Sequence, residues 1–150
     1  KFAEVYRIIL RADTGDLSTL EEELKLIDSY MYLLNIRFKD SIDFSMEVKD
    51  EDKEKVLPPL SIQMLIENAL KHNKASASEP IRIVIRSIEN DFIQVENNIQ
   101  KKKFMPADRQ GTGLLNIQKR YAYFTEKQVN INHDEQRFVV DLPLLNIDYD

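Results

Sequence analysis

The chain has 150 residues, of which 43% are hydrophobic and 31% charged, and its formal net charge is −5. This length suits one domain with its own core, and the acidic balance argues against broad binding to nucleic acid or anionic lipid. No apolar run approaches the roughly 18–20 residues of a membrane span, and no signal-peptide pattern is found. Cysteine is absent, which excludes disulfides and thiolate chemistry and agrees with a cytoplasmic location.

The first part of the chain is predicted to be helical. Residues 1–11 have the apolar period of a helix that starts upstream, so we expect the chain to be a piece of a longer protein. After a break at "ADTGD" (residues 12–16), a second helix should run to about Phe38, with Ser18 and Glu21 spaced as a capping box. Its buried stripe is predicted to contain Leu20, Leu24, Ile27, Met31 and Leu34.

The rest of the chain alternates strands with two more helices. Residues 42–48 alternate apolar and polar side chains, as in a strand with one wet face, and Pro58-Pro59 stops regular structure before the next helix. Hairpins are predicted over residues 81–98 and 128–144, the second with its turn near residues 134–135. A long loop over residues 99–110 precedes a helix from residue 113 to about 124. This order predicts an α+β sandwich, a mostly antiparallel sheet with helices on one face.

The segment "LIENALKHN" (residues 65–73) concentrates versatile polar side chains beside a buried face. Glu67 and Lys71, and likewise Asn68 and His72, are spaced i, i+4 along the border of this face. The amide oxygen of Asn68 suits Mg²⁺, which bridges to substrate phosphates, and Lys71 could meet the same phosphates. The plain alternative is a solvated helix side with one ion pair. The apolar stripe itself is predicted to contain Ile62, Leu65, Ile66, Ala69 and Leu70.

Two of the three glycines, Gly111 and Gly113, lie in "GTGLLN" at the junction of the long loop and the following helix. Glycine allows backbone N–H groups to approach a ligand, and a helix N-terminus adds partial positive charge. The pair therefore fits a phosphate cradle, although a lone GxG is weak evidence and is more often just a flexible loop end. The combination of this segment with "LIENALKHN" is more specific than either alone.

At this point the sequence resembles a known family, the LytS-like (YehU-like) sensor histidine kinases. "LPPLSIQMLIENALKHN" (residues 57–73) is similar to their N-box, and "GTGLLNIQKRY" (residues 111–121) to their second glycine box. "LSTLEEELKLIDSYMYLLNIRF" (residues 17–38) resembles the segment that joins their phosphoacceptor helices to the ATP-binding domain. The resemblance implies a Bergerat-type two-layer α/β sandwich. Residues 1–40 would end the phosphoacceptor and linker region, and residues 41–150 would form the ATP-binding catalytic domain.

The resemblance also implies roles for individual residues. Asn68 would bind Mg²⁺, Lys71 and His72 would face the phosphates of ATP, and Glu67 would lie beside the metal site, which makes the last three the candidate catalytic residues. Asn97, at the end of a strand, aligns with an Asp that accepts a hydrogen bond from the adenine amino group, and no glycine follows it here. The residues expected to wrap or support the triphosphate are Gly111, Thr112, Gly113, Leu114, Asn116 and Arg120.

The implied function is transfer of the γ-phosphoryl group of ATP to a histidine in a two-component system. Neither histidine of the chain, His72 or His133, lies in a stretch like the family's H-F-x-x-N, so the acceptor is expected upstream of residue 1 and the chain should not phosphorylate itself. The implied partners are the phosphoacceptor helices of the same kinase, in a homodimer, and a response regulator; no nucleic acid and no membrane contact by this piece are expected. Its location would be the cytoplasmic end of a membrane-anchored bacterial sensor.

Two alternatives remain open from the sequence. The Asn at position 97 favours weaker nucleotide binding, so the domain could be a degenerate nucleotide-binding or pseudokinase docking module. The wider Bergerat superfamily also contains ATPases that place a water-activating carboxylate about one turn before the metal-binding Asn. That position is occupied by Met64, which disfavours hydrolysis as the main activity.

Overall fold

The computed structural model of the protein describes residues 16–100 and 112–146. Within these ranges a five-stranded sheet has the strand order β2-β4-β5-β7-β6. Strand β2 is parallel to β4, and each of the other neighbouring pairs is antiparallel. The strands are β2 (Ile42–Glu47), β4 (Ile81–Ile88), β5 (Phe92–Asn98), β6 (Asn130–His133) and β7 (Arg137–Pro143).

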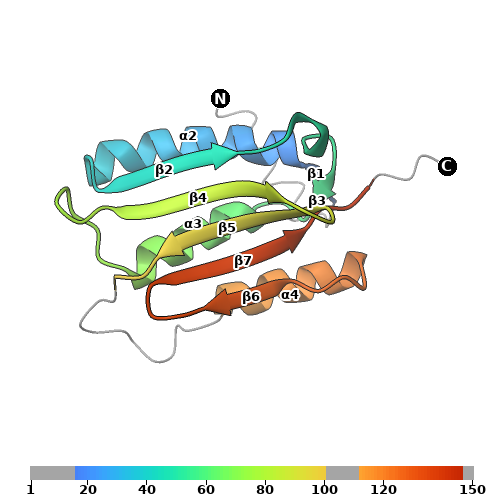
Figure 1. Ribbon diagram of the computed structural model, residues 1–150. Helices are drawn as coiled ribbons and strands as arrows, with labels where there is room; N and C mark the ends of the chain where they lie inside the picture. Colours follow the sequence, from blue (N-terminus) through green and yellow to red (C-terminus); the bar gives the residue numbers. More distant parts are fainter. Residues whose placement is uncertain (1–15, 101–111, 147–150) are drawn as a thin grey trace.

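The helices α2 (Leu20–Phe38), α3 (Ser61–His72) and α4 (Thr112–Phe124) lie together on one face of this sheet (Figure 1). Two short strands, β1 (Ser18–Thr19) and β3 (Val56–Leu57), pair beside them, and a short 3-10 helix, η1 (Asp50–Asp52), precedes β3. The predicted α+β sandwich with a mostly antiparallel sheet is therefore confirmed. The predicted helix over residues 1–11 lies outside the described residues.

The core fills the space between the helices and the inner face of the sheet. The stripes predicted on α2 and α3 are buried, except that Leu70 is only partly buried. The strands supply alternate residues to the same core, as a sheet with one covered face requires. On β4, β5 and β7 these are Ile81, Ile83, Ile85, Ile93, Val95, Val140 and Leu142.

The cap of α2 differs from the prediction by one residue. The Oγ1 atom of Thr19 accepts a hydrogen bond from the Glu22 N–H at 3.1 Å, so Thr19 is the N-cap. Ser18 cannot cap the helix with Glu21 because it is a buried residue of β1 and pairs with Leu57 of β3. A strand pairing between distant parts of the chain therefore moves the helix start by one position.

The charged segment between β2 and β3 contains η1, and Lys55 anchors it. The Lys55 ammonium pairs with Asp52 and also with Asp91, which lies in the tight turn between β4 and β5. Burial acts to raise the pKa of Asp52, but hydrogen bonds from Lys55 and Ser87 outweigh it, so the pKa is lowered. This cluster fastens the segment before α3 to one end of the sheet.

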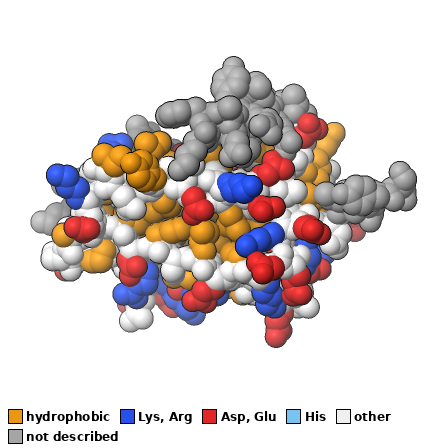
Figure 2. All heavy atoms as spheres, turned by 90° about the horizontal axis from the view of Figure 1, so that it is seen from above, with side chains coloured by type: hydrophobic (Ala, Val, Ile, Leu, Met, Phe, Trp, Pro, Cys, Tyr) orange, Lys and Arg blue, Asp and Glu red, His pale blue; other side chains and the backbone are white. Residues whose placement is uncertain are grey.

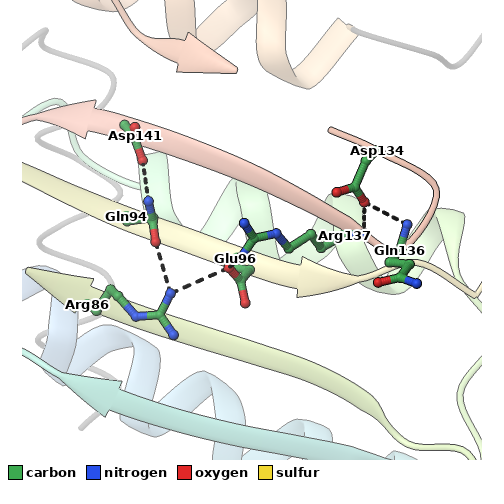
Figure 3. Close-up of polar contacts among 7 residues, drawn as sticks. All are labelled: Arg86, Gln94, Glu96, Asp134, Gln136, Arg137 and Asp141. Atoms are coloured by element: carbon green, nitrogen blue, oxygen red, sulfur yellow. Dashed lines mark hydrogen bonds and ion pairs between the residues drawn. The ribbon is translucent and has the colours of Figure 1, made fainter. Parts of the chain in front are cut away.

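Polar side chains cover the face of the sheet that the helices leave open (Figure 3). Arg86 donates to Gln94 at 2.9 Å and pairs with Glu96 at 3.4 Å, and Gln94 donates to Asp141 at 2.9 Å. Arg137 also pairs with Glu96, at 3.0 Å. These charged and polar groups pair with one another across neighbouring strands, as expected for a sheet face turned toward water.

Helix α2 and strand β2 lie at the upper edge of the molecule in Figure 1. Seen from above, the surface shows hydrophobic side chains among charged ones (Figure 2). On α2 the exposed large side chains are Tyr32, Leu33 and Ile36, on the side away from the core. Among the described residues no helix combines the length and the apolar character needed to cross a membrane.

Candidate functional site

The site is built where α3 and α4 pack together on the sheet. Asn68 of α3 faces Gly113, which is the second residue of α4. A β-carbon placed on Gly113 would lie 3.0 Å from Nδ2 and 3.1 Å from Oδ1 of Asn68. These distances are tighter than an ordinary contact, so a side chain at position 113 would require the Asn68 amide to shift, and the start of α4 lies close against that side chain.

Arg120, two turns after Gly113 on α4, meets Met64, one turn before Asn68 on α3. The guanidinium Nη1 lies 3.8 Å from the Met64 sulfur, and both side chains are partly buried. Burial lowers the pKa of Arg120, whereas the negative charge of Glu23 on α2 acts to raise it. Arg120 therefore lies between α3 and α4, on the side of Glu23, and not on the outer surface of α4.

The other polar residues predicted on α3 border the same helix. Glu67 and Lys71 are exposed, and His72 is half-buried at the last position of the helix. Glu67 accepts a hydrogen bond from Gln63 at 3.2 Å, one turn toward the helix start, and so pairs there rather than with Lys71. The polar side chains lie along one border of α3 as predicted, but Glu67 accepts from Gln63.

Asn97 lies on the inner face of β5, next to Ile83 of β4 and Phe138 of β7. It is buried, with 7% of its surface exposed, although it is the second-last residue of its strand. Its Nδ2 atom donates to the Asn98 carbonyl at 2.8 Å, which leaves the amide oxygen as the acceptor. The side chain thus presents an oriented oxygen on the helix-covered side of the sheet.

The remaining residues singled out from the sequence lie on α4, on β6 or outside the described residues. Leu114 is half-buried and Asn116 is exposed, one turn before Arg120. Thr112 is the first residue of α4, and Gly111 lies outside the described residues together with most of the predicted loop. His133 is exposed on β6 and stacks on Phe138, with ring centroids 6.2 Å apart.

Sequence reasoning missed Asn73, the residue that ends α3. Its Nδ2 atom donates to the Ala69 carbonyl at 2.8 Å, and its Oδ1 accepts from the Gln100 N–H at 2.7 Å. The Lys74 N–H also donates to the Gln100 carbonyl, at 2.7 Å. These bonds fasten the end of α3 to the chain that leaves β5. The position of Asn73 directly after a periodic apolar stripe was the available signal, since Asn is common at helix ends.

Glu23 was also missed. It belongs to α2, is fully buried, and accepts a hydrogen bond from the Ser61 N–H at the start of α3 at 3.1 Å. Burial raises its pKa to about 8, against the opposing effects of the Ser61 and Leu60 backbone and of Arg120. Three helices therefore meet at one buried carboxyl group, at the opposite end of α3 from His72.

Comparison with known proteins agrees with this geometry. A family model described as histidine kinase matches residues 1–42. The chain is 28% identical to the sensor histidine kinase YesM of Bacillus subtilis over 142 residues, which are 87% of this chain and 25% of YesM. It is 29% identical to the sensor protein LytS of Bacillus cereus over 129 residues, 77% of this chain and 22% of LytS. The chain is homologous to these sensor histidine kinases.

The chain spans about a quarter of the length of these relatives. Among solved structures, the catalytic domain of histidine kinase ThkA superposes with a TM-score of 0.55 at 17% identity, over 87% of this chain and 99% of that domain. Full-length ShkA in complex with AMPPNP superposes with a TM-score of 0.54 at 14% identity, over 89% of this chain and 32% of ShkA. The predicted Bergerat-type fold of a histidine kinase catalytic domain is therefore confirmed.

Proposed function

We propose that the chain is the ATP-binding catalytic domain of a two-component sensor histidine kinase. It would transfer the γ-phosphoryl group of ATP to a histidine that lies outside residues 1–150. The observation that carries this proposal is the close approach of Gly113 to the Asn68 amide, which joins the two segments that the resemblance had linked to Mg²⁺ and triphosphate. The homology to sensor histidine kinases and the shared fold support the same activity.

The side chains around Asn68 fit Mg²⁺ that is bound mainly by water and phosphate. They do not resemble a site in which protein side chains supply all the metal ligands. Among residues 16–100 and 112–146, no group of three or more His, Cys, Asp or Glu side chains could hold a metal ion. Mg²⁺ is commonly bound through one or two protein oxygens, with waters and substrate phosphates as the other ligands. Asn68 would supply such an oxygen, and bound Mg²⁺ would neutralise phosphate charge.

The chain's own groups would hold the rest of the nucleotide. The positive end of the α4 dipole, at Thr112 and Gly113, would face the phosphates together with Gly111, because unpaired N–H groups at a helix start favour anions. Lys71 and His72 would add charge and hydrogen bonds from α3, and Glu67 would stand beside the metal site. Asn97 would accept from the adenine amino group through its oriented oxygen.

These residues would act mostly by positioning ATP and neutralising the charge of its phosphates, as in phosphoryl transfer generally. A neutral imidazole acceptor is itself nucleophilic, so the domain needs no strong base. Met64, one turn before Asn68, cannot activate water, and the Arg120 guanidinium lies against its sulfur. The lack of a carboxylate at position 64 agrees with transfer to a protein acceptor rather than hydrolysis.

The partners follow from the same proposal. The domain would act on the phosphoacceptor helices of its own kinase, within a homodimer, and the phosphoryl group would pass to a response regulator. Residues 1–40 would belong to the helical linker and residues 41–150 to the catalytic domain, although α2 shares its core with α3 and the sheet. The domain would work at the cytoplasmic end of a membrane-anchored sensor.

A degenerate nucleotide-binding or docking module is the second candidate, and the Asn at position 97 favours it. A neutral amide lacks the charge assistance that a carboxylate gives to a hydrogen bond, so adenine would be held less strongly. Both candidates have the same fold, but only the kinase domain would transfer the phosphoryl group of ATP.

The test combines binding with transfer. Calorimetric titration of the 150-residue chain with ATP should show binding that Mg²⁺ tightens and a chelator weakens. Incubation with γ-labelled ATP and the phosphoacceptor helices of the same kinase should then place acid-labile, alkali-stable label on those helices. Binding without transfer would select the docking module, and label on His72 or His133 in the chain alone would contradict the assignment of the acceptor.

A further inference from the structure

The start of α3 lacks a capping side chain of its own. Its N-cap residue is Leu60, which has a left-handed backbone (φ 68°) and makes no side-chain cap hydrogen bond. The Ser61 hydroxyl, the nearest candidate, donates instead to the Pro58 carbonyl at 2.7 Å. The N–H groups of a first helical turn need acceptors, and here the acceptor comes from another helix. The Ser61 N–H donates to Oε1 of Glu23, 3.1 Å away on α2.

Glu23 is an unexpected residue for this position. It lies among the apolar stripe of α2 and has 0% of its surface exposed. Its second oxygen, Oε2, has no hydrogen-bond partner within the described part of the chain. A buried polar atom left unpaired destabilises the fold, so packing alone would favour an apolar side chain here. The carboxyl group therefore calls for an explanation beyond core formation.

Charged and titratable groups face this carboxyl group from two helices. From α4, Arg120 acts with opposite charge and Tyr121 with its buried hydroxyl, which donates to the Pro143 carbonyl at 2.9 Å. From α2 itself, Glu22 acts with like charge, and from α3 the Ser61 and Leu60 backbone favours the ionised form. Arg120 in turn contacts Met64, one turn before Asn68. Glu23 thus accepts a hydrogen bond from α3 and interacts electrostatically with α4, the two helices that form the proposed nucleotide site.

We propose that Glu23 is the positioning residue through which α2 sets the geometry of the nucleotide site. Its carboxyl group fixes the first turn of α3 and faces Arg120 of α4, so that Asn68 stays against Gly113. The seven residue-to-residue steps from Ser61 to Asn68 span about 10 Å of rigid helix, and a shift at one end moves the other. The proposal rests on the proposed function for the identity of the ligand, whereas the link between the helices stands on the geometry alone.

The charge state of Glu23 gives this link a measurable signature. Ionised Glu23 attracts Arg120, whereas the neutral acid leaves the guanidinium free for phosphate. Binding of a polyanion near Arg120 would likewise favour the protonated acid. By linkage, the affinity for Mg²⁺–ATP should fall as pH rises through the pKa of Glu23, about 8.

The experiment compares the wild type with Glu23→Gln, Glu23→Ala and the matched control Glu21→Gln, which removes an exposed charge from the same helical turn. Mg²⁺–ATP dissociation constants are measured by calorimetry from about pH 6.5 to about pH 9. Wild type and Glu21→Gln should lose affinity by about fivefold or more across this range. Glu23→Gln should keep its low-pH affinity throughout, because the amide still accepts from the Ser61 N–H. Glu23→Ala should bind more weakly at every pH.

Two results would overturn the proposal. One is a Glu23→Gln profile that follows the wild-type pH dependence, and the other is a folded Glu23→Ala domain with wild-type affinity. Hydrogen exchange of the nucleotide-free chains provides the second readout: Glu23→Ala should speed exchange along α3 from its first turn, and unchanged exchange would also count against the link. A wild-type chain that binds no nucleotide at any pH would instead refute the proposed function, while the exchange comparison would still decide whether Glu23 fixes α3.

Discussion

The Asn68 amide lies across the α3–α4 interface from Gly113, so close that a β-carbon on Gly113 would press against it. A β-carbon on Gly113 would lie 3.0 Å from Nδ2 and 3.1 Å from Oδ1 of the Asn68 amide. These distances are shorter than ordinary van der Waals contacts, so any other residue at position 113 must displace that amide. The glycine is therefore needed for the position of one particular side chain.

Gly113→Ala should separate stability from binding. Alanine favours a helix over glycine by up to about 1 kcal/mol, so the free energy of unfolding should stay the same or rise slightly. The added methyl group should push the Asn68 amide away, and the affinity for Mg²⁺–ATP should fall by about tenfold or more, as when a group that orients a metal ligand is changed. Chemical denaturation and calorimetric titration of the same preparations provide both measurements.

The double variant identifies the cause. In an Asn68→Ala background, where no amide can be displaced, Gly113→Ala should change the affinity much less than it does in the wild type. Equal losses in the two backgrounds would show that the methyl group acts on the glycine loop and not through Asn68.

Asn68→Ala by itself tests the metal site. The variant should fold, because Asn68 is partly exposed at the border of the buried stripe of α3. It should lose most of the tightening that Mg²⁺ brings to ATP binding, while its affinity in chelator stays close to that of the wild type. Asn132→Ala, which removes an exposed amide from β6, is the control and should keep the full Mg²⁺ response. If Asn68→Ala also kept it, the polar strip of α3 would be only a solvated helix face.

Local patterns predicted most of the fold. The hairpin of β4 and β5 was located from two alternating runs and a short turn, and the structure gives it at residues 81–88 and 92–98. The stripes of α2 and α3 were equally clear, because a helical period depends only on neighbouring residues. The cap of α2 was wrong by one residue because the pairing of β1 with β3 depends on a distant segment.

The site shows where sequence reasoning ends. Asn68 and Gly113 were singled out by residue type and by resemblance, yet no spacing rule predicts that they touch. Glu23 looked like one of three acidic residues in the first turn of α2, a common composition at a helix start. Its burial depends on how α2 packs against α3 and α4, which a single sequence does not reveal. The position of Glu23 is therefore set by tertiary packing, which no sequence motif indicates.

Asn97 should control the affinity for adenine independently of the metal. Asn97→Ala removes the proposed acceptor and should weaken ATP binding by about 1–3 kcal/mol, the usual cost of leaving a buried polar partner unpaired. Its Mg²⁺ response should remain. Asn97→Asp should tighten ATP binding, because a carboxylate gives a charge-assisted hydrogen bond. Titrations with ATP and GTP, each with Mg²⁺ and with chelator, make the comparison, and equal losses for both nucleotides in Asn97→Ala would argue against adenine recognition by this residue.

Glu23 should also make the stability of the domain depend on pH in a direction opposite to that of most carboxylates. Its pKa is raised by burial from 4.5 to about 8, so between these values the folded state holds a proton that the unfolded state has released. The free energy of unfolding should therefore fall as pH rises through this window, by up to about 1.4 kcal/mol per pH unit from this group, and level off above it. Below the window, both states are protonated and the group has no effect.

Glu23→Gln should remove this dependence. The amide has nearly the shape of the neutral acid and can still accept from the Ser61 N–H, but it does not ionise. The variant should match the wild type near pH 5 and exceed it near pH 8, by an amount on the order of a few kcal/mol. Denaturant unfolding of wild type, Glu23→Gln and Glu21→Gln at several pH values measures the difference. Parallel pH profiles for wild type and Glu23→Gln would show that the carboxyl group is not neutral in the folded domain.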